Sequence, residues 1–327
     1  MTALSAKQLL GWVLRAIDES GWQALVIDAE KPFKARLFQS DGKGFDVRVY
    51  IWNCTHGGGQ KRAPDEYRVQ LTGTVPDIAA DETTLLLGWH SGLEVFVGFD
   101  INKYVGQSSH SPSIQVKQET LLGAHTQSFA VQKRQNDELA VAFWPEFFAE
   151  YALNVTVLHA TGKTASDVSL FNQLDTLTED QIEAVRNNNR RTVLAQIFRK
   201  YRAADFRRRV LGAYSNRCAF CGVQLELIDA AHIIPVVAQT STDETTNGVA
   251  LCKLHHAAFD RNLVSFDERY RIEISDSEVS RLKEANLIGG LKEFKRCIRT
   301  AIIMPNDRRD YPSPKYIAEA RRVRRWS

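Results

Sequence analysis

The stretch from Cys218 to Asp260 constrains this chain more than any other. It contains two pairs of potential metal ligands, Cys218 with Cys221 and Cys252 with His255, and two residues separate the members of each pair. One tight turn aims both side chains of such a pair at one point, so two pairs can close a tetrahedral zinc site. A site filled by four protein ligands is of the structural kind. A disulfide is the alternative, and the lack of a visible secretory segment disfavours it.

Three further polar residues follow one another in the same stretch. His232 comes after the first cysteine pair, Asn247 precedes Gly248, and His256 follows the fourth zinc candidate directly. A lone histidine is more often a packed structural residue, so the order of all three matters. The motifs Asp229-Ala-Ala-His232-Ile, Asn247-Gly248 and Leu251-Cys-x-x-His-His256-x-x-Phe-Asp260 together resemble the HNH endonuclease family, whose fold is a ββα-metal finger.

The resemblance implies a role for each of these side chains. Hydrolysis of a phosphodiester needs an activated water and a cation beside the developing negative charge. His232 would be the general base, since the pKa of an imidazole lies near neutrality. His256 would hold a catalytic Mg²⁺ or Mn²⁺, with Asp260, four residues later on the same helical face, or Asp229 as the second ligand. Asn247 either orients the loop that bears His232 or contacts the metal.

The sequence departs from the commonest pattern of that family at two positions. Many members carry an acidic residue or a histidine directly before the base, where this chain has Ala231. The second ligand pair also ends in a histidine instead of a cysteine. We therefore assign His255 to zinc and His256 to the catalytic metal, because the reverse assignment makes the two pairs unequal in spacing.

Positive charge is concentrated just before the first cysteine. Between Val185 and Arg217 there are ten Lys and Arg residues and one acidic residue, Asp205, although the net charge of the whole chain is only +3. Such a segment beside a nuclease-like finger is expected to face the phosphate backbone of DNA, and a merely solvated helix face is the alternative. The candidate contacts are Arg190, Arg191, Arg207, Arg208 and Arg209.

Residues 1–160 are expected to form an α+β recognition domain. Ser5-x-x-Gln8 fits a capping box in front of a helix. The alternation of apolar and polar residues over Phe45–Trp52 and Glu66–Leu71 predicts half-buried strands. A helix followed by several strands favours a helix-plus-antiparallel-sheet domain over alternating βαβ units.

One loop of this domain offers hydrogen-bond donors to DNA. Segment 53–62 contains consecutive glycines, which let a backbone approach a ligand closely. The spaced ending of a phosphate-binding P-loop is absent, and a plain hairpin loop is the alternative. The candidate DNA contacts are His56, Gln60, Lys61 and Arg62. An aromatic set, Trp89, Phe96, Phe99 and Tyr104, is expected to belong to the core more than to a platform for a flipped base.

The remaining expectations concern organisation and location. We expect a basic helical linker at 161–204 and the HNH nuclease domain, with its structural zinc, at 205–327. One helix is expected to end near Asn187, and two more are expected over 193–201 and 206–211. The basic residues Arg321, Arg322, Arg324 and Arg325 are expected either to clamp DNA or to form a solubilising tail. Cys54 and Cys297 lie outside the zinc set, and this cysteine usage suits a reducing cytoplasm. No apolar run is long enough to span a membrane.

A sensor domain ahead of such a finger resembles modification-dependent, type IV-like restriction enzymes. That resemblance implies that residues 1–160 bind double-stranded DNA carrying a modified base, and that the finger cuts nearby as a metal-dependent endonuclease. One alternative is a conventional, sequence-specific type II restriction endonuclease. Others are an anti-phage effector nuclease gated by a nucleotide second messenger and a binding module with an inactive finger. Because one finger cuts one strand at a time, we expect a homodimer.

Overall fold

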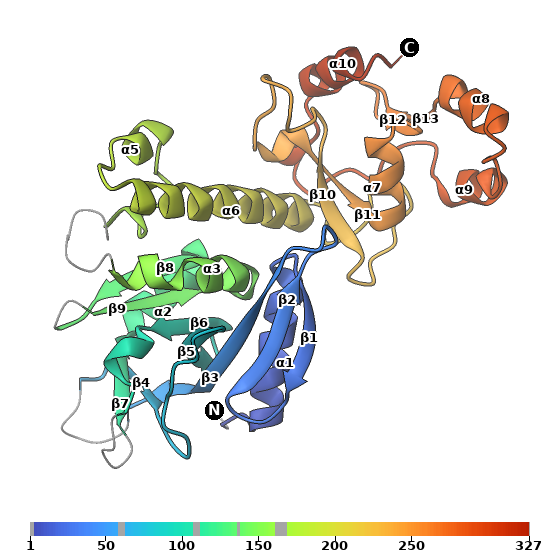
Figure 1. Cartoon of the computed structure of the whole chain (residues 1–327). Coiled ribbons are helices and arrows are strands. Elements are labelled where there is room, and N and C mark those ends of the chain that lie inside the picture. Colours follow the sequence, from blue (N-terminus) through green and yellow to red (C-terminus); the bar gives the residue numbers. More distant parts are fainter. Residues whose placement is uncertain (1–2, 58–62, 107–111, 136–137, 161–168, 327) are drawn as a thin grey trace. The chain divides into compact units, whose positions relative to one another are not determined.

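The chain forms two compact units, Met1–Tyr201 (unit 1) and Arg202–Ser327 (unit 2), which are coloured along the sequence in Figure 1. The structure is a computed structural model, and it describes residues 3–57, 63–106, 112–135, 138–160 and 169–326. The boundary between the units falls inside one long helix, so each unit is described by itself.

The first helix has the start that its sequence predicts. Helix α1 (Ala6–Glu19) is capped by Ser5, whose hydroxyl accepts a hydrogen bond from the Gln8 amide, while the Gln8 side chain accepts one from the Ser5 amide. This reciprocal arrangement satisfies amides that have no partner within the helix. Leu9 and Val13 lie on the buried face of α1.

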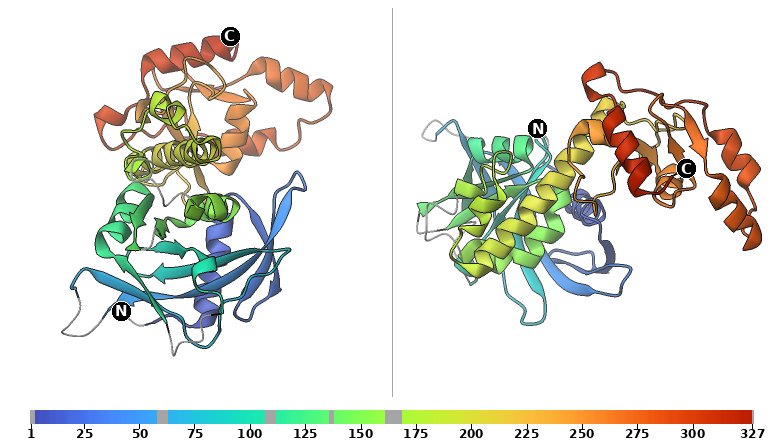
Figure 2. Two further views of the ribbon diagram at one scale, coloured as in Figure 1. Left: turned by 60° about the vertical axis from the view of Figure 1, so that its left-hand side comes forward. Right: turned by 90° about the horizontal axis from the view of Figure 1, so that it is seen from above.

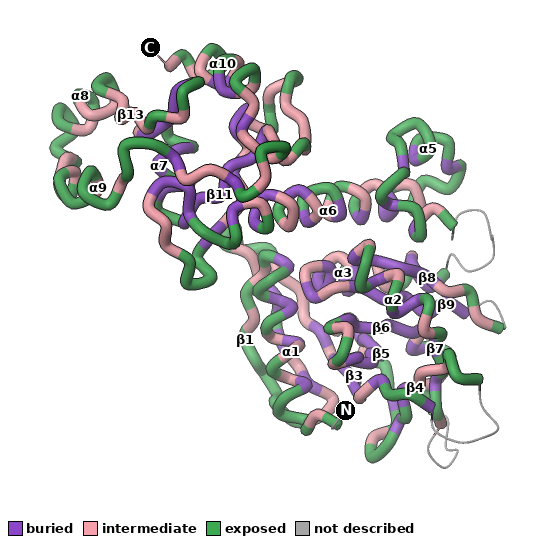
Figure 3. The backbone as a smooth tube through the Cα atoms, turned by 180° about the vertical axis from the view of Figure 1, so that it is seen from behind, coloured by how far each residue is buried: buried purple, intermediate pink, exposed green. Residues whose placement is uncertain are grey.

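Unit 1 is built on a nine-stranded sheet with the order β1-β2-β3-β5-β6-β9-β8, while β4 pairs with β3 and β7. The edge strand β1 is exposed along most of its length (Figure 3). The strands are β1 (Gln23–Asp28), β2 (Phe33–Phe38), β3 (Gly44–His56), β4 (Glu66–Gln70), β5 (Thr83–His90), β6 (Val95–Phe99), β7 (Ser113–Lys117), β8 (Phe129–Lys133) and β9 (Leu139–Phe143). The helices and 3₁₀ turns after α1 are η1 (Ile101–Lys103), α2 (Gln118–Gln127), η3 (Pro145–Phe147), α3 (Phe148–Ala160) and α5 (Glu179–Glu183).

One strand pair corrects the expectation of an antiparallel sheet. β3 and β5 run parallel, with Val49 opposite Leu85, so the sheet of this α+β unit is mixed. β3 is 13 residues long, and its last residues pair with the antiparallel strand β4. The chain then returns to the beginning of β3 before β5 starts. Alternation along a strand encodes which side chains are buried but not the direction of the neighbouring strand, so the sequence pattern could not show this pair.

Helices cover both faces of the sheet (Figure 2). On one face Trp12 of α1 stacks on Trp89 of β5, with ring centroids 4.4 Å apart. On the other face Leu121 of α2 packs into the same buried cluster as Phe99 of β6. Trp89, Phe96 and Phe99 are all fully buried, as expected for core residues and not for a base-stacking platform.

A single helix replaces the two that the sequence suggested between Val193 and Leu211. Helix α6 (Asn188–Ala213) runs unbroken for 26 residues. The residues between the two apolar groups, 202–205, interrupt the apolar pattern but are compatible with a helix, because none of them is Gly or Pro. Asn187, expected to end the preceding helix, instead caps α6 by accepting a hydrogen bond from the Arg190 amide.

Unit 2 contains the expected ββα finger. Strands β10 (Ile228–His232) and β11 (Gly248–Cys252) pair antiparallel, and α7 (Lys253–Asp260) follows β11 directly. Around the finger lie η4 (Thr245–Asn247), β12 (Val264–Phe266), β13 (Ile272–Ile274), α8 (Asp276–Glu284), α9 (Leu291–Cys297), η5 (Arg308–Asp310) and α10 (Pro314–Val323). Within the described ranges, no helix combines the length and the apolar character needed to cross a bilayer.

The basic end of the chain is attached to the finger. Arg324 follows α10 and donates hydrogen bonds to the Phe259 carbonyl and to Asn262 Oδ1, at the end of α7. Its guanidinium carbon also lies 4.6 Å from the centroid of the Phe259 ring. Arg321 pairs with Glu273 of β13. These arginines therefore act as internal attachments of unit 2, where the sequence left open a DNA clamp or a solubilising tail.

Candidate active site and metal centre

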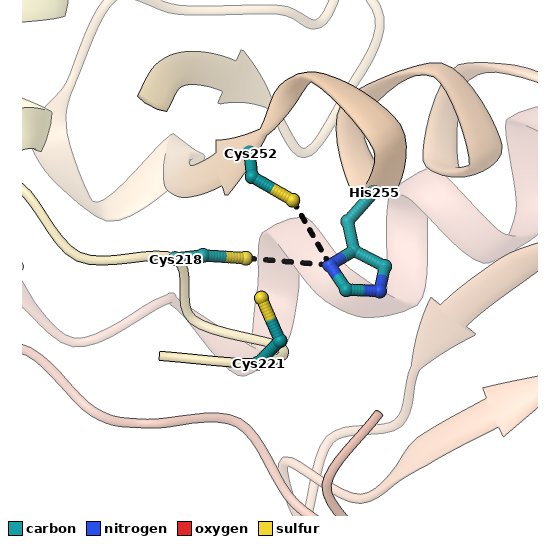
Figure 4. Close-up of side chains that lie close together, drawn as sticks. All are labelled: Cys218, Cys221, Cys252 and His255. Carbon is teal, nitrogen blue, oxygen red and sulfur yellow. Dashed lines mark hydrogen bonds between the residues drawn. The ribbon is translucent and has the colours of Figure 1, made fainter. Parts of the chain in front are cut away.

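The four predicted zinc ligands lie together in unit 2 (Figure 4). Their ligand atoms are all within 4.8 Å of one another. His255 Nδ1 lies 3.5 Å from Cys218 Sγ and 3.2 Å from Cys252 Sγ, and Cys221 completes the group from the turn after α6. Zinc–sulfur bonds of about 2.3 Å in a tetrahedron place the sulfurs about 3.8 Å apart, which agrees with this cluster.

The electrostatics of the cluster also suit a bound cation. Burial raises the pKa of Cys218, but hydrogen bonds from His255 and from backbone amides outweigh it and bring the pKa to about 6. Burial raises the pKa of Cys221 to about 12, so this thiol would lose a proton on binding zinc. His255 Nε2 is buried without a hydrogen-bond partner in the described part of the chain, while Nδ1 faces the sulfurs. The residues present therefore fit a structural zinc ion.

His232 ends strand β10 at the edge of the finger. Its ring stacks on Phe206 of α6, with centroids 3.8 Å apart and planes at 11°. Its Nε2 lies 3.0 Å from Asp243 Oδ1. Burial lowers the pKa of His232, although Asp243 raises it in part. The imidazole is therefore neutral at pH 7 and keeps one nitrogen as a proton acceptor.

Asp243 is a site residue that sequence reasoning missed. It lies in the loop between β10 and β11, and its spacing from His232 follows no motif that we could read. Only the folded loop brings the carboxylate to the imidazole. The one available signal was its chemical type, an acidic residue shortly before Asn247.

Asn247 is fully buried behind this loop. Its Oδ1 accepts a hydrogen bond of 3.0 Å from the Ile234 amide, and its Nδ2 donates one of 2.8 Å to the Thr242 carbonyl. Its own carbonyl accepts a further bond from the Ile233 amide. The side chain thus fastens both ends of the loop that leaves His232. Of the two roles left open by the sequence, this geometry corresponds to orienting the loop.

His256 lies between two carboxylates. Its Nδ1 is 3.8 Å from Asp229 Oδ2, and its Nε2 is 3.4 Å from Asp260 Oδ2. Hydrogen bonding to His256 and to Lys253 lowers the pKa of Asp229 against the effect of burial, so this carboxylate is ionised. Arg207 lies 3.6 Å from the same residue.

The structure does not gather the three candidate ligands of the catalytic metal around one point. Asp229 and Asp260 face opposite ring nitrogens of His256, and one nitrogen binds one metal ion. Among the residues that the structure describes, the cysteine–histidine cluster is the only group of three or more ligand atoms close enough to share an ion. In this arrangement His256 can hold a divalent cation with either carboxylate, which agrees with the few protein ligands that Mg²⁺ usually takes.

The predicted DNA-contacting arginines of α6 make contacts within the chain. Arg191 bonds to Asn188 in the first turn of the helix, where Arg190 also lies. Arg207 donates to the Ile228 carbonyl of β10. Arg208 and Arg209 both pair with Asp205, and Arg209 also reaches Thr245 and the Asp243 carbonyl.

Of the predicted DNA contacts in unit 1, one lies in the described part. His56 Nε2 lies 2.8 Å from the Pro64 carbonyl oxygen, and its ring meets Tyr67 edge-on. Gln60, Lys61 and Arg62 lie outside the described residues.

Comparison with known proteins adds two family assignments. Residues 218–267 match the HNH endonuclease family model, and this range includes every zinc and catalytic candidate named above. Residues 45–152 match the family model described as methylase-associated X1. One solved structure, described as a modification dependent TagI restriction endonuclease, is 12% identical over 85% of this chain and 80% of that chain, with a TM-score of 0.30. A search of curated proteins found no match. The chain therefore carries a segment that matches the methylase-associated X1 model and, after it, a segment that matches the HNH endonuclease model.

Proposed function

We propose that this protein is a restriction-type DNA endonuclease that depends on a divalent metal and on a modified base in its substrate. One observation carries the proposal. Within the HNH match, a neutral His232 is held by Phe206 and Asp243 and lies close enough to His256 for His256 to lower its pKa. A separate cysteine–histidine cluster fits structural zinc. One group for proton transfer and one for a cation are the two elements that phosphodiester hydrolysis requires.

The residues of the finger account for the chemistry as follows. His232 accepts a proton from a water molecule at Nδ1, and the water oxygen attacks the phosphorus as the bond to the leaving oxygen breaks. Asn247 keeps the loop behind His232 in place through its bonds to Ile234 and Thr242. A Mg²⁺ or Mn²⁺ ion held by His256 with Asp229 or Asp260 would neutralise charge on the phosphate and on the leaving oxygen.

Unit 1 is proposed to recognise the DNA. Its matching family is named for an association with methylases, and an association of this kind supports a role as a reader of methylated DNA. We further propose that two copies act together, since one finger cuts one strand. A working location in the cytoplasm agrees with a cluster of three thiols that must stay reduced to bind zinc.

The test is cleavage of one plasmid in several forms with Mg²⁺ or Mn²⁺ present. One form is unmodified, and the others carry 5-methylcytosine, 5-hydroxymethylcytosine or N6-methyladenine. We expect cutting of a modified form that His232→Ala abolishes and that Glu284→Ala, an exposed change on α8, leaves intact. Discrete cutting of unmodified DNA would indicate a conventional type II enzyme. Cutting only after a small nucleotide is added would indicate a gated effector.

A further inference from the structure

We propose that Asp243 is a positioning residue that sets the tautomer of His232, so that Nδ1 is the nitrogen that accepts the proton. The inference rests on the proposed nuclease function. It starts from the 3.0 Å contact between His232 Nε2 and Asp243 Oδ1. An ionised carboxylate can only accept a hydrogen bond, so the proton of the neutral imidazole must lie on Nε2. The lone pair that remains for water is then on Nδ1.

The Asp243 carboxylate is itself held in one orientation. Arg202 donates to Asp243 Oδ2 from Nε at 2.8 Å and from a terminal nitrogen at 2.7 Å. Arg209 donates to the Asp243 backbone carbonyl at 2.7 Å. One carboxylate oxygen therefore faces the arginine, and the other faces the imidazole. Both arginines lie on α6, so this helix orients the Asp243 carboxylate, which in turn orients His232.

The same helix limits the rotation of the imidazole. Phe206 of α6 lies flat against the ring of His232, at 3.8 Å between centroids. A ring that is stacked on one face and hydrogen-bonded at one nitrogen has little freedom to turn. Positioning of this kind matters because a proton acceptor displaced from its target loses much of its effect.

Three charged or titratable groups act on His232 from the elements around it. Asp243, from the loop, raises the pKa of the imidazole. Arg202, from α6, and His256, from α7, lower it, and burial lowers it further. Loss of the Asp243 charge alone should therefore move the pKa of His232 downward.

Asparagine at position 243 gives the sharpest test. Arg202 is a donor and would take the amide oxygen of Asp243→Asn, which leaves the NH₂ group facing His232 Nε2. That nitrogen must then accept, and the proton moves to Nδ1, where the water should bind. We expect the single-turnover cleavage rate to fall on the order of 10³–10⁴-fold, the scale of a wrong-tautomer base. Asp243→Ala, which imposes no tautomer, should lose less, about 10²-fold.

The pH profile separates this role from a purely structural one. The acid limb of the rate should move to lower pH in Asp243→Ala, because the charge that raises the pKa of His232 is gone. Asp307→Asn serves as the control, since Asp307 is also paired with an arginine of unit 2 but has a side chain that is 43% exposed. Near-normal cutting by Asp243→Asn would overturn the proposal, because this variant keeps the size of the side chain and its bond to Arg202.

A second measurement does not need cleavage at all. Imidazole ¹⁵N NMR of the full zinc-loaded chain, with the His232 signals assigned by His232→Gln, should show the Nε2–H form in the wild type and the Nδ1–H form in Asp243→Asn. An unchanged tautomer in Asp243→Asn would refute the inference. So would a loss of activity that added Mn²⁺ restores, which would make Asp243 a metal ligand. If the wild type cuts no DNA, the proposed function fails and the NMR result still decides the tautomer.

Discussion

The two units of this chain are held together in different ways. Unit 1 buries large aromatic side chains in one sheet, and Trp89, Phe96 and Phe143 have no exposed surface. Unit 2 pairs strands of five or three residues, and its zinc candidates come from a turn, a strand end and a helix start. Apolar burial thus stabilises the first unit, while the second also contains a ligand cluster that fits a structural ion. From this difference we expect that stability and chemistry can be changed independently in this molecule.

The strongest test of that contrast removes one zinc ligand. Cys218→Ser should abolish zinc binding and the thermal transition of unit 2 while leaving that of unit 1, because structural zinc contributes roughly 10–16 kcal/mol in small fingers. Calorimetry together with zinc analysis would measure both effects. Cys297→Ser is the matched control, an exposed cysteine of the same unit. Loss of both transitions would show that the two units do not unfold separately.

The second test separates chemistry from stability inside unit 2. His232→Ala should lower the cleavage rate by about 10²–10⁴-fold or more, since a general base contributes on this scale. Zinc content and the affinity for DNA should stay close to those of the wild type. The measurement is single-turnover cleavage beside a binding assay. A comparable loss of folding would mean that His232 is a structural residue.

The third test destabilises unit 1 and leaves unit 2 unchanged. Phe96→Ala should destabilise unit 1 by about 3–5 kcal/mol, because it leaves a cavity in a packed core. Urea unfolding followed by tryptophan fluorescence would report it, with zinc content unchanged. Leu122→Ala, on the exposed side of α2, is the control. A fall in zinc content would show that the sheet supports the finger.

The sequence alone specified much of the finger, because its chemistry depends on residue types at short spacings. The Cys-x-x-Cys and Cys-x-x-His pairs and the ββα order were all readable, and the structure brings the four zinc candidates together. Asp243 was not readable, because it reaches His232 only through the fold of a loop. The separation of Asp229 and Asp260 onto opposite nitrogens of His256 likewise depends on side-chain geometry.

In unit 1 the sequence specified the elements better than their arrangement. The capping box at Ser5 and the alternation in β3 marked a helix and a strand that the structure contains. The parallel pairing of β3 with β5 was missed, because it depends on how the chain returns across the sheet. The continuity of α6 was missed because residues 202–205 interrupt the apolar pattern without interrupting the helix.

A smaller effect is expected where α10 attaches to the finger. Arg324→Ala removes two hydrogen bonds at the end of α7 and a contact with the Phe259 ring, so unit 2 should lose about 1–3 kcal/mol. Chemical unfolding monitored at the zinc cluster would measure this loss. Arg325→Ala, at the exposed neighbouring position, should change little. Equal effects of the two would argue against the attachment.

The smallest effect concerns pH. Burial sets the pKa of His232 below its ordinary value of about 6.5, so the base stays neutral as the pH falls towards that value. At saturating metal, the cleavage rate should therefore fall with decreasing pH only below about pH 6.5. The unfolded chain binds this proton more readily, so protonation also reduces the stability of unit 2 on the acid side. An acid limb above pH 7 would contradict the shift.

The Arg324 contact has a consequence for the timing of synthesis. The residue that clamps the end of α7 lies 65 positions after Phe259, so a ribosome must add that much chain before the helix carrying His256 is secured. Unit 1 precedes it and can fold while the rest is still being made. A chain released before Arg324 is added would thus contain the sheet of unit 1 but lack the contact that stabilises the end of α7. The order of the polypeptide would therefore delay the proposed DNA-cutting activity until the part proposed to choose its target already exists.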